Sequence, residues 1–327
     1  MAVTQTRSAI AATGLRKSFG EHVVLDGIDL DVSEGTVFAL LGPNGAGKTV
    51  TVKILSTLIT GDGGEARVAG HDVATDPDAV RAEIGVTGQF SAVDDLLTGE
   101  ENLMLMADLA HLGRSEGRQR AAELLDHFDL TEAAKKTPAT YSGGMKRRLD
   151  LAMTLVDSPR IIFLDEPTTG LDPRSRRTMW RIIRDLVAGG VTIFLTTQYL
   201  EEADELADRI AILDNGKLVA EGSPGELKRR IPGGYVLLRF TDTGGLESAA
   251  RTLGEAVGGA SRDDDALALR VPTDGSVGTL KAVLDRLDGE SLAVDGLSLH
   301  TPDLDDVFLA LTGEPHVGNP DTGKDRS

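Results

Sequence analysis

The sequence contains no cysteine, and this absence excludes disulfide bonds and thiolate chemistry from its 327 residues. It also contains no apolar run near the ~18 residues that a bilayer-spanning helix needs. Residues 1–8 lack the apolar core of a signal peptide. We therefore expect a chain that is soluble by itself, so that any role at a membrane depends on a partner.

Basic charge is scarce as well. The chain has 34 Lys and Arg against 52 Asp and Glu, which gives a formal net charge of −18. Because nucleic-acid binding needs a basic face, we expect no nucleic-acid partner. The six histidines have no metal-ligand spacing, so no zinc site is assigned. We interpret the acidic run at 263–265 as surface loop, not as a metal site.

One stretch matches the phosphate-loop pattern G-x-x-x-x-G-K-[ST]. It follows an apolar run, Val37–Leu41, that is typical of a buried strand, and it precedes a helical pattern from about Lys48 to Leu58. Glycines at such a loop let backbone N–H groups approach phosphate oxygens at a helix N-terminus. Lys48 would hold the β- and γ-phosphates, and the Thr49 hydroxyl would bind Mg²⁺. The predicted nucleotide-binding residues here are Gly42, Pro43, Asn44, Gly45, Ala46, Gly47, Lys48, Thr49 and Val50.

A second apolar run, Ile161–Leu164, ends in two acids. An aspartate at the end of a strand beside a phosphate loop can hold Mg²⁺, usually through water, which is the role we assign to Asp165. Glu166 is the candidate general base for the attacking water.

A further glycine-bearing helix start lies at Ser142, Gly143 and Gly144. Ser142 is a good N-cap, and exposed N–H groups with a helix dipole favour phosphate. A chain with one complete phosphate loop does not need this second site for itself. We therefore predict that it serves the nucleotide of another copy. The neighbouring clusters Lys146–Arg148 and Arg174–Arg177 are interpreted as solvated faces or seam contacts.

Alternating strands and helices predict an α/β core with a mixed, largely parallel sheet. After it, the pattern β-α-β-β-α-β predicts a small α+β domain of ferredoxin-like order, whose last strand spans 291–299. The first strand is predicted at 10–13. The predicted organisation is an unstructured N-terminus (1–8), a nucleotide-binding domain (9–230) with a helical subdomain (about 91–158), a linker (231–234), a C-terminal domain (235–312) and an unstructured tail (313–327).

The order of these motifs resembles the nucleotide-binding subunit of ABC transporters, a P-loop NTPase family, over about residues 8–230. The motifs that carry the resemblance are Gly42–Thr49, Gln89, Tyr141–Met145, Ile161–Glu166, Leu171-Asp172 and Gln198. More narrowly, Val86–Gln89, Leu195–Leu200 and Leu304–Gly313 resemble the daunorubicin/doxorubicin-resistance type of ATPase subunit. This narrower resemblance extends through the C-terminal domain.

The resemblance implies a homodimer that closes head to tail around two ATP molecules. Gln89 would sense Mg²⁺ and couple the site to a membrane partner, and Asp172 would line the dimer seam. Phe19 falls where the family stacks an aromatic ring on adenine, although a core position is the alternative. Gln198 replaces the usual switch histidine, and a neutral amide cannot carry a proton or a positive charge. We therefore expect ATP hydrolysis that is slow in the isolated subunit.

The resemblance also implies a separately encoded transmembrane permease that handles a small amphipathic drug or antibiotic. The chain would dock on it through about residues 91–136, at the cytoplasmic face of the membrane, and drive export. The alternative is a soluble ABC-type ATPase that acts as a regulator or on a macromolecular assembly. A translation factor of this type would carry two phosphate loops, a chromosome protein a long coiled coil, and a GTPase an Asn-Lys-x-Asp element; none is present. The C-terminal domain is left open between a regulatory and a dimer-stabilising module.

Overall fold

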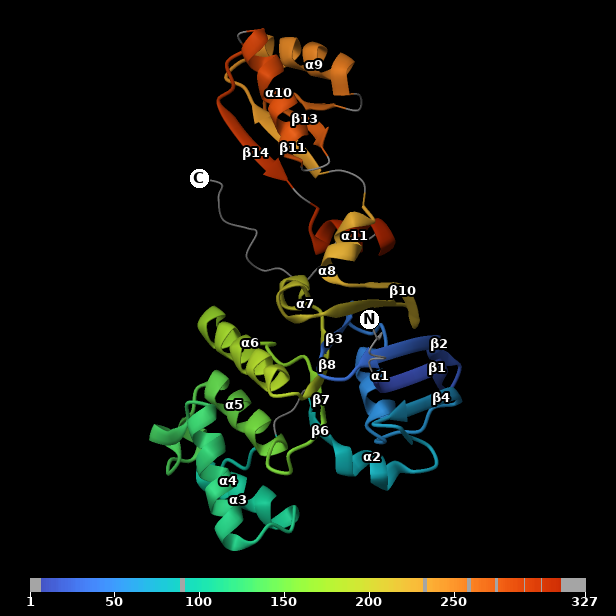
Figure 1. Cartoon of the computed structure of the whole chain (residues 1–327), viewed down its shortest axis with the longest axis vertical. Coiled ribbons are helices and arrows are strands. Elements are labelled where there is room, and N and C mark those ends of the chain that lie inside the picture. The colour runs from blue at the N-terminus through green and yellow to red at the C-terminus, as the bar shows by residue number, and fades with distance from the viewer. Residues whose placement is uncertain are drawn as a thin grey trace, which may run out of the picture. The chain divides into compact units, whose positions relative to one another are not determined.

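The computed structural model describes residues 7–88, 92–231, 234–257, 260–273, 276–290, 292–300 and 302–312 (Figure 1). The chain divides into two compact units, of which the first ends at Pro224 and the second begins at Gly225. Several predictions fall wholly or partly outside the described residues, among them the unstructured N-terminus up to residue 6, Gln89, positions 232–233 of the linker, and the tail from 313.

The first unit is built on a six-stranded sheet of order β10-β9-β3-β8-β7-β6. All neighbouring pairs are parallel except β9 with β10, so the sheet is mixed and largely parallel, as predicted. Every residue of β3 is buried, because both faces of this central strand are covered. The strands are β3 (Val37–Leu41), β6 (Ile84–Thr87), β7 (Ile161–Asp165), β8 (Thr192–Thr197), β9 (Arg209–Asp214) and β10 (Lys217–Gly222).

A smaller sheet of order β2-β1-β4-β5 packs beside it, with antiparallel pairing throughout. Its strands are β1 (Ser8–Phe19), β2 (His22–Ser33), β4 (Gly63–Val68) and β5 (His71–Asp72). The prediction of a first strand at 10–13 was too short, and Ser8 is not unstructured, because it pairs with Ser33. Gly14 has φ +61° at an irregularity between Ala12 and Leu15. This bulge breaks the period-2 alternation that would have revealed the second half of the strand.

Helices cover both faces of the six-stranded sheet. In Figure 1, α1 and α2 lie on the side of the antiparallel sheet, whereas α5 and α6 lie on the opposite side. The helices are α1 (Lys48–Leu55), α2 (Pro77–Glu83), α3 (Gly99–Leu109), α4 (Arg114–His127), α5 (Gly143–Thr154), α6 (Pro173–Ala188) and α7 (Leu200–Leu206). The predicted first helix was too long: α1 ends at Leu55, because Thr57 adopts a left-handed φ of 63°.

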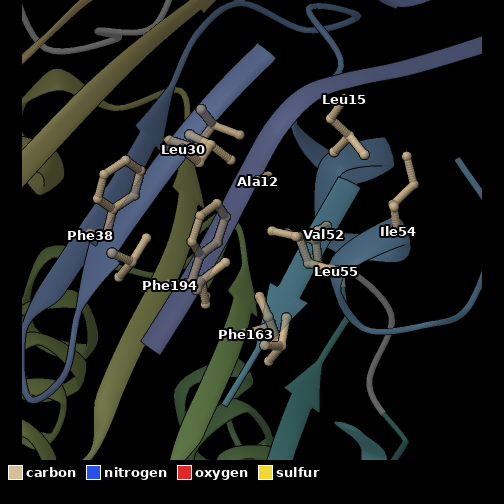
Figure 2. Packing of buried hydrophobic residues seen from close by; sticks show 14 of the residues in the cluster. Ala12, Leu15, Leu30, Phe38, Val52, Ile54, Leu55, Phe163 and Phe194 are labelled. Atoms are coloured by element: carbon tan, nitrogen blue, oxygen red, sulfur yellow. The ribbon is translucent and has the colours of Figure 1, made fainter. Parts of the chain in front are cut away.

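The hydrophobic core of this unit lies between the two sheets and α1 (Figure 2). Phe194 of β8 stacks on Phe38 of β3, with ring centroids 5.4 Å apart, and lies 5.6 Å from Phe163 of β7. Val52 and Leu55 of α1 pack into the same cluster. This packing fixes the ends of β3 and β7, from which the loops of the candidate site leave.

The second unit confirms the predicted β-α-β-β-α-β order. Its sheet has the order β12-β13-β11-β14 and is antiparallel throughout, which is the ferredoxin-like topology. Its elements are α8 (Pro224–Arg229), β11 (Gly234–Arg239), α9 (Thr243–Val257), β12 (Ser261–Asp263), β13 (Ala268–Thr273), α10 (Val277–Gly289), β14 (Gly296–His300) and α11 (Leu304–Thr312). The sequence analysis missed α8 and started the last strand too early. The N–H of Leu292 still bonds back to Leu287 of α10, so the chain is turning there.

Candidate nucleotide-binding site

The phosphate loop joins β3 to α1, and two of its glycines are required by close packing. A Cβ on Gly42 would lie 2.2 Å from the Leu213 carbonyl oxygen of β9. Gly47 has φ +110°, and a Cβ there would lie 2.7 Å from Leu25 of β2. The Gly42 contact is with backbone, so any larger residue there would displace the loop. At Gly47 the positive φ itself disfavours any other residue.

Lys48, the first residue of α1, is buried. Its Nζ donates to the carbonyl oxygens of Gly42 (2.7 Å) and Pro43 (3.0 Å), and it lies 3.8 Å from Oε1 of Glu166. Burial lowers the pKa of Lys48, while the carboxylates of Glu166 and Asp165 oppose that shift. The structure therefore brings the predicted phosphate-binding cation and the predicted general base together.

The two predicted Mg²⁺ ligands of the described chain also meet. The Thr49 hydroxyl donates to Asp165, with Oγ1 2.9 Å from Oδ2, and the Thr196 hydroxyl of β8 donates to Oδ1 of the same carboxylate. Thr49 and Asp165 offer only oxygen atoms, which are the ligands that Mg²⁺ prefers. These residues fit the ion.

Glu166 occupies a strained backbone position directly after β7. Its φ is 50°, in the left-handed region, which costs a non-glycine residue roughly 1–2 kcal/mol. The strain is held by Thr196, whose carbonyl oxygen accepts from the Glu166 N–H at 3.1 Å. The Thr169 hydroxyl donates to Oε2 at 3.2 Å. Strain held by neighbours in this way is typical of a functional position.

Ser142, Gly143 and Gly144 begin α5 on the other side of the six-stranded sheet from α1 (Figure 1). Ser142 caps the helix as predicted, because its Oγ accepts from the Met145 N–H at 3.2 Å. Ser142 and Gly143 are exposed, and nothing lies within 4 Å of the place where a Cβ of Gly143 would be. Within one chain, this helix start and the phosphate loop are not brought together.

Asp172 lies beside that helix start. It caps α6, accepting from the backbone N–H groups of Arg174 and Ser175 and, at 2.6 Å, from the Ser175 hydroxyl. The hydrogen bond from the Ser175 side chain is the main reason that the pKa of Asp172 is lowered. A Cβ on Gly144 would lie 2.4 Å from Ser175 Oγ, so Gly144 is needed for α5 and α6 to pack.

Two further predicted residues lie near the ends of strands. Phe19 ends β1 and is 54% exposed, which removes the alternative of a core phenylalanine. Lys17 Nζ lies 5.3 Å from its ring centroid. Gln198 is partly buried between β8 and α7.

Sequence reasoning missed two polar residues. The cluster that contains Arg147 was interpreted as a solvated face or a seam contact, but the Arg147 side chain is only 12% exposed, and it donates to backbone carbonyls near Glu166. Glu202 of α7 is completely buried. Helical spacing was the available signal: Arg147 shares a face with buried Gly144 and Leu151, and Glu202 lies four residues before buried Leu206 on α7.

Glu202 joins the segment after Glu166 to the one that holds Gln198. Its Oε1 accepts from the Thr168 hydroxyl at 2.7 Å and from Trp180 Nε1 at 3.2 Å. Burial raises the pKa of Glu202, against the opposing effects of hydrogen bonds from Thr197, Thr168 and Trp180. Burial therefore favours the protonated form of Glu202 more strongly in the folded chain than in the unfolded chain.

We expect Glu202→Gln to remove part of the pH dependence of stability. Above the ordinary pKa of 4.5, the folded chain retains a proton on Glu202 that the unfolded chain releases, so wild-type stability falls as pH rises. Glutamine keeps an acceptor for Thr168 but does not ionise. We compare the unfolding free energy of the variant with that of wild type. The difference, variant minus wild type, should increase from pH 5 to pH 8, by up to about 1.4 kcal/mol per pH unit. Urea unfolding at both pH values measures it, with the exposed Glu205→Gln as control; an equal difference at both would contradict the prediction.

The fold and site define a P-loop ATPase with a helical subdomain and a second exposed, capped helix start at Ser142. An ABC transporter family model matches residues 25–169. A daunorubicin resistance ATP-binding protein of Streptomyces coeruleorubidus is 48% identical, covering 93% of this chain and 95% of the relative. A doxorubicin resistance ATP-binding protein of Mycobacterium tuberculosis is 44% identical over 94% of both chains. The chain belongs to the ATP-binding subunits of ABC transporters, in the group of the daunorubicin and doxorubicin resistance ATP-binding proteins, and is an ATPase coupled to transport.

Solved structures agree on the fold of the core. An ATP-binding subunit of an ABC transporter superposes with a TM-score of 0.61 and 29% identity, covering 68% of this chain and 92% of that one. A dimeric ATP-binding cassette in a post-hydrolysis state, bound to ADP and Pi, gives a TM-score of 0.60 at 27% identity, covering 65% and 98%. Within the described part of the present chain, no helix is both long and apolar enough to cross a membrane.

Proposed function

We propose that two copies of this chain close head to tail around two Mg-ATP molecules and drive a separately encoded permease that exports a small amphipathic drug. The observation that carries the dimer is the separation of the two phosphate-directed elements. Ser142 and Gly143 are exposed on one side of the six-stranded sheet, and the phosphate loop leads into α1 on the other. A second copy can bring the two together, and the similar cassette bound to ADP and Pi is dimeric.

Each residue has a role in this proposal. The loop from Gly42 to Val50 surrounds the phosphates of one ATP, and Ser142, Gly143 and Gly144 of the other copy contact the same ATP. Lys48 holds the β- and γ-phosphates, Phe19 stacks on adenine, and Asp172 lines the seam. Thr49, Asp165 and Gln89 would hold Mg²⁺, which neutralises phosphate charge when bound.

Glu166 receives a proton from the attacking water, because its carboxylate is held beside Lys48 and after the Mg²⁺-binding Asp165. Gln198 donates a hydrogen bond to the γ-phosphate, but a neutral amide adds no positive charge there. Hydrolysis in the isolated chain is therefore slow, and the membrane partner accelerates it.

The relatives support the cargo and the direction. Besides the daunorubicin and doxorubicin resistance proteins, a Nod factor export ATP-binding protein I of Ralstonia nicotianae is 36% identical over 93% of this chain. We infer export of an amphipathic drug, with the chain held at the cytoplasmic face of the membrane by its permease. ATP-dependent doxorubicin uptake into inverted vesicles that contain the chain and a copurifying membrane subunit would support this cargo; ATP hydrolysis without uptake would contradict it.

The mass of a Glu166→Gln variant in solution tests the dimer. The amide keeps the shape of the side chain but cannot take a proton from water, so bound ATP should persist. On addition of Mg-ATP we expect a shift from the monomer mass of 34.5 kDa to twice that value. The shift should be absent with ATP and EDTA. A variant that binds ATP and stays monomeric would contradict the head-to-tail dimer.

A further inference from the structure

We propose that Arg147 and Asp150 of α5 are positioning residues for ATP hydrolysis: they fix the backbone around Glu166 to the helix that begins with Ser142. The proposal rests on the dimeric site described above and adds to it a connection within each chain. No nucleotide needs to touch either residue.

Arg147 donates to the backbone carbonyl oxygens of Glu166 and of the residues directly before and after it. Its Nη2 lies 3.0 Å from the Asp165 oxygen and 3.3 Å from the Glu166 oxygen, and its Nε lies 3.1 Å from the Pro167 oxygen. One planar guanidinium therefore holds three consecutive peptide groups. A lysine ammonium, which is a single point on a flexible stem, cannot span them in the same way.

The same guanidinium reaches a second segment. Nη1 of Arg147 donates to the Gly88 carbonyl oxygen at 2.7 Å, just beyond the end of β6. Asp150, one turn later on α5, accepts from the backbone N–H of Ala92, with Oδ1 at 2.9 Å. The pair thus holds the chain on both sides of residues 89–91, and the two side chains are 3.4 Å apart.

The burial and charge of Arg147 and Asp150 indicate that their contacts are a specific feature of the fold. Asp150 is 3% exposed, and the Arg147 side chain is 12% exposed. Burial lowers the pKa of Arg147, and the carboxylates of Asp150, Asp165 and Glu202 oppose that shift. Apart from Asp150, the hydrogen-bond acceptors of Arg147 are uncharged backbone carbonyls, and burying an arginine among them is costly unless its fixed geometry is used.

These contacts of Arg147 constrain the backbone of Glu166. Its left-handed backbone is held by Thr196 from β8 on one side and by Arg147 from α5 on the other. When Ser142 and Gly143 meet the nucleotide of the other copy, the position of α5 becomes fixed, and Arg147 transmits that position to the peptide that carries Glu166. Arg147 should therefore affect the rate of hydrolysis and leave ATP binding to the monomer unchanged.

The test compares Arg147→Lys with wild type, using the full chain. We expect kcat for ATP hydrolysis to fall at least tenfold, with KM and the dissociation constant for a fluorescent ATP analogue within threefold of wild type. Arg148→Lys is the matched control on the same helix, because Arg148 makes no hydrogen bond to either segment in the part of the chain that the structure describes, and it should retain kcat. A folded Arg147→Lys variant with wild-type kcat would overturn the proposal.

Asp150→Asn tests the positioning role if Arg147→Lys does not fold. The asparagine oxygen still accepts from Ala92, but the charge opposite Arg147 is lost, and kcat of the folded variant should fall severalfold; unchanged kcat would overturn the proposal. Wild type, measured in parallel, distinguishes failure of the proposed dimeric site from failure of the positioning role. If wild type neither dimerises nor hydrolyses ATP, the proposed dimeric site fails. If wild type does both and the variants match it, only the positioning role fails.

Discussion

Lys48→Ala is expected to weaken ATP binding by roughly 10²–10⁴-fold, because the variant loses two charge-assisted hydrogen bonds worth about 1.5–3 kcal/mol each. In the structure, Nζ of Lys48 is aimed at the loop by the carbonyl oxygens of Gly42 and Pro43. Its removal also leaves the carboxylate of Glu166, whose side chain is only 10% exposed, without the nearby cation. An uncompensated negative charge beside the phosphates adds to the loss.

Titration calorimetry with ATP measures this effect, and α1 supplies its own control. Lys53→Ala removes an exposed lysine from the same helix and should leave the dissociation constant within threefold of wild type. The thermal midpoint of Lys48→Ala should not fall by more than a few degrees, since the burial that lowers the pKa of Lys48 is itself a cost of folding. A folded Lys48→Ala variant that binds ATP normally would show that the phosphate loop is not the nucleotide site.

Gly143→Asp is expected to abolish ATP-driven dimerisation and to lower hydrolysis at least 100-fold, without loss of stability. Nothing in the chain lies within 4 Å of a Cβ at this position, so the new side chain meets no neighbour of its own chain. A carboxylate in the first turn of α5 stabilises that helix by about 0.3–1 kcal/mol. The same carboxylate would face the phosphates bound by the other copy, where opposed like charges cost several kcal/mol.

Solution mass in the Glu166→Gln background and ATP hydrolysis in the wild-type background measure the two effects. Monomer affinity for ATP should stay at the wild-type value, because the phosphate loop of the same chain is untouched. Gly113→Asp is a matched control: Gly113 is also open to solvent and precedes helix α4. If Gly143→Asp dimerises and hydrolyses ATP as well as Gly113→Asp does, the contact between copies at this helix start is refuted.

Local physical chemistry determined much of this protein from the sequence alone. The phosphate loop is set by glycines, a buried strand and a helix start that follow one another along the chain, and each is visible in a short window. The helix caps at Ser142 and Asp172 are equally local, because the capping oxygen bonds the N–H groups two or three residues onward. The β-α-β-β-α-β order of the second unit came from periodicity in the same way.

Only the tertiary structure decided which polar residues are buried and what they hold. Arg147 is close in sequence to two other basic residues, and its burial depends on carbonyl oxygens of Gly88 and Pro167, which are 59 and 20 residues away. Glu202 finds Thr168 and Trp180 at separations of 34 and 22 residues. The cost of burying such groups is offset by partners that no local window contains. The sequence therefore predicts which residues would meet the nucleotide, and long-range packing determines which residues hold them in place.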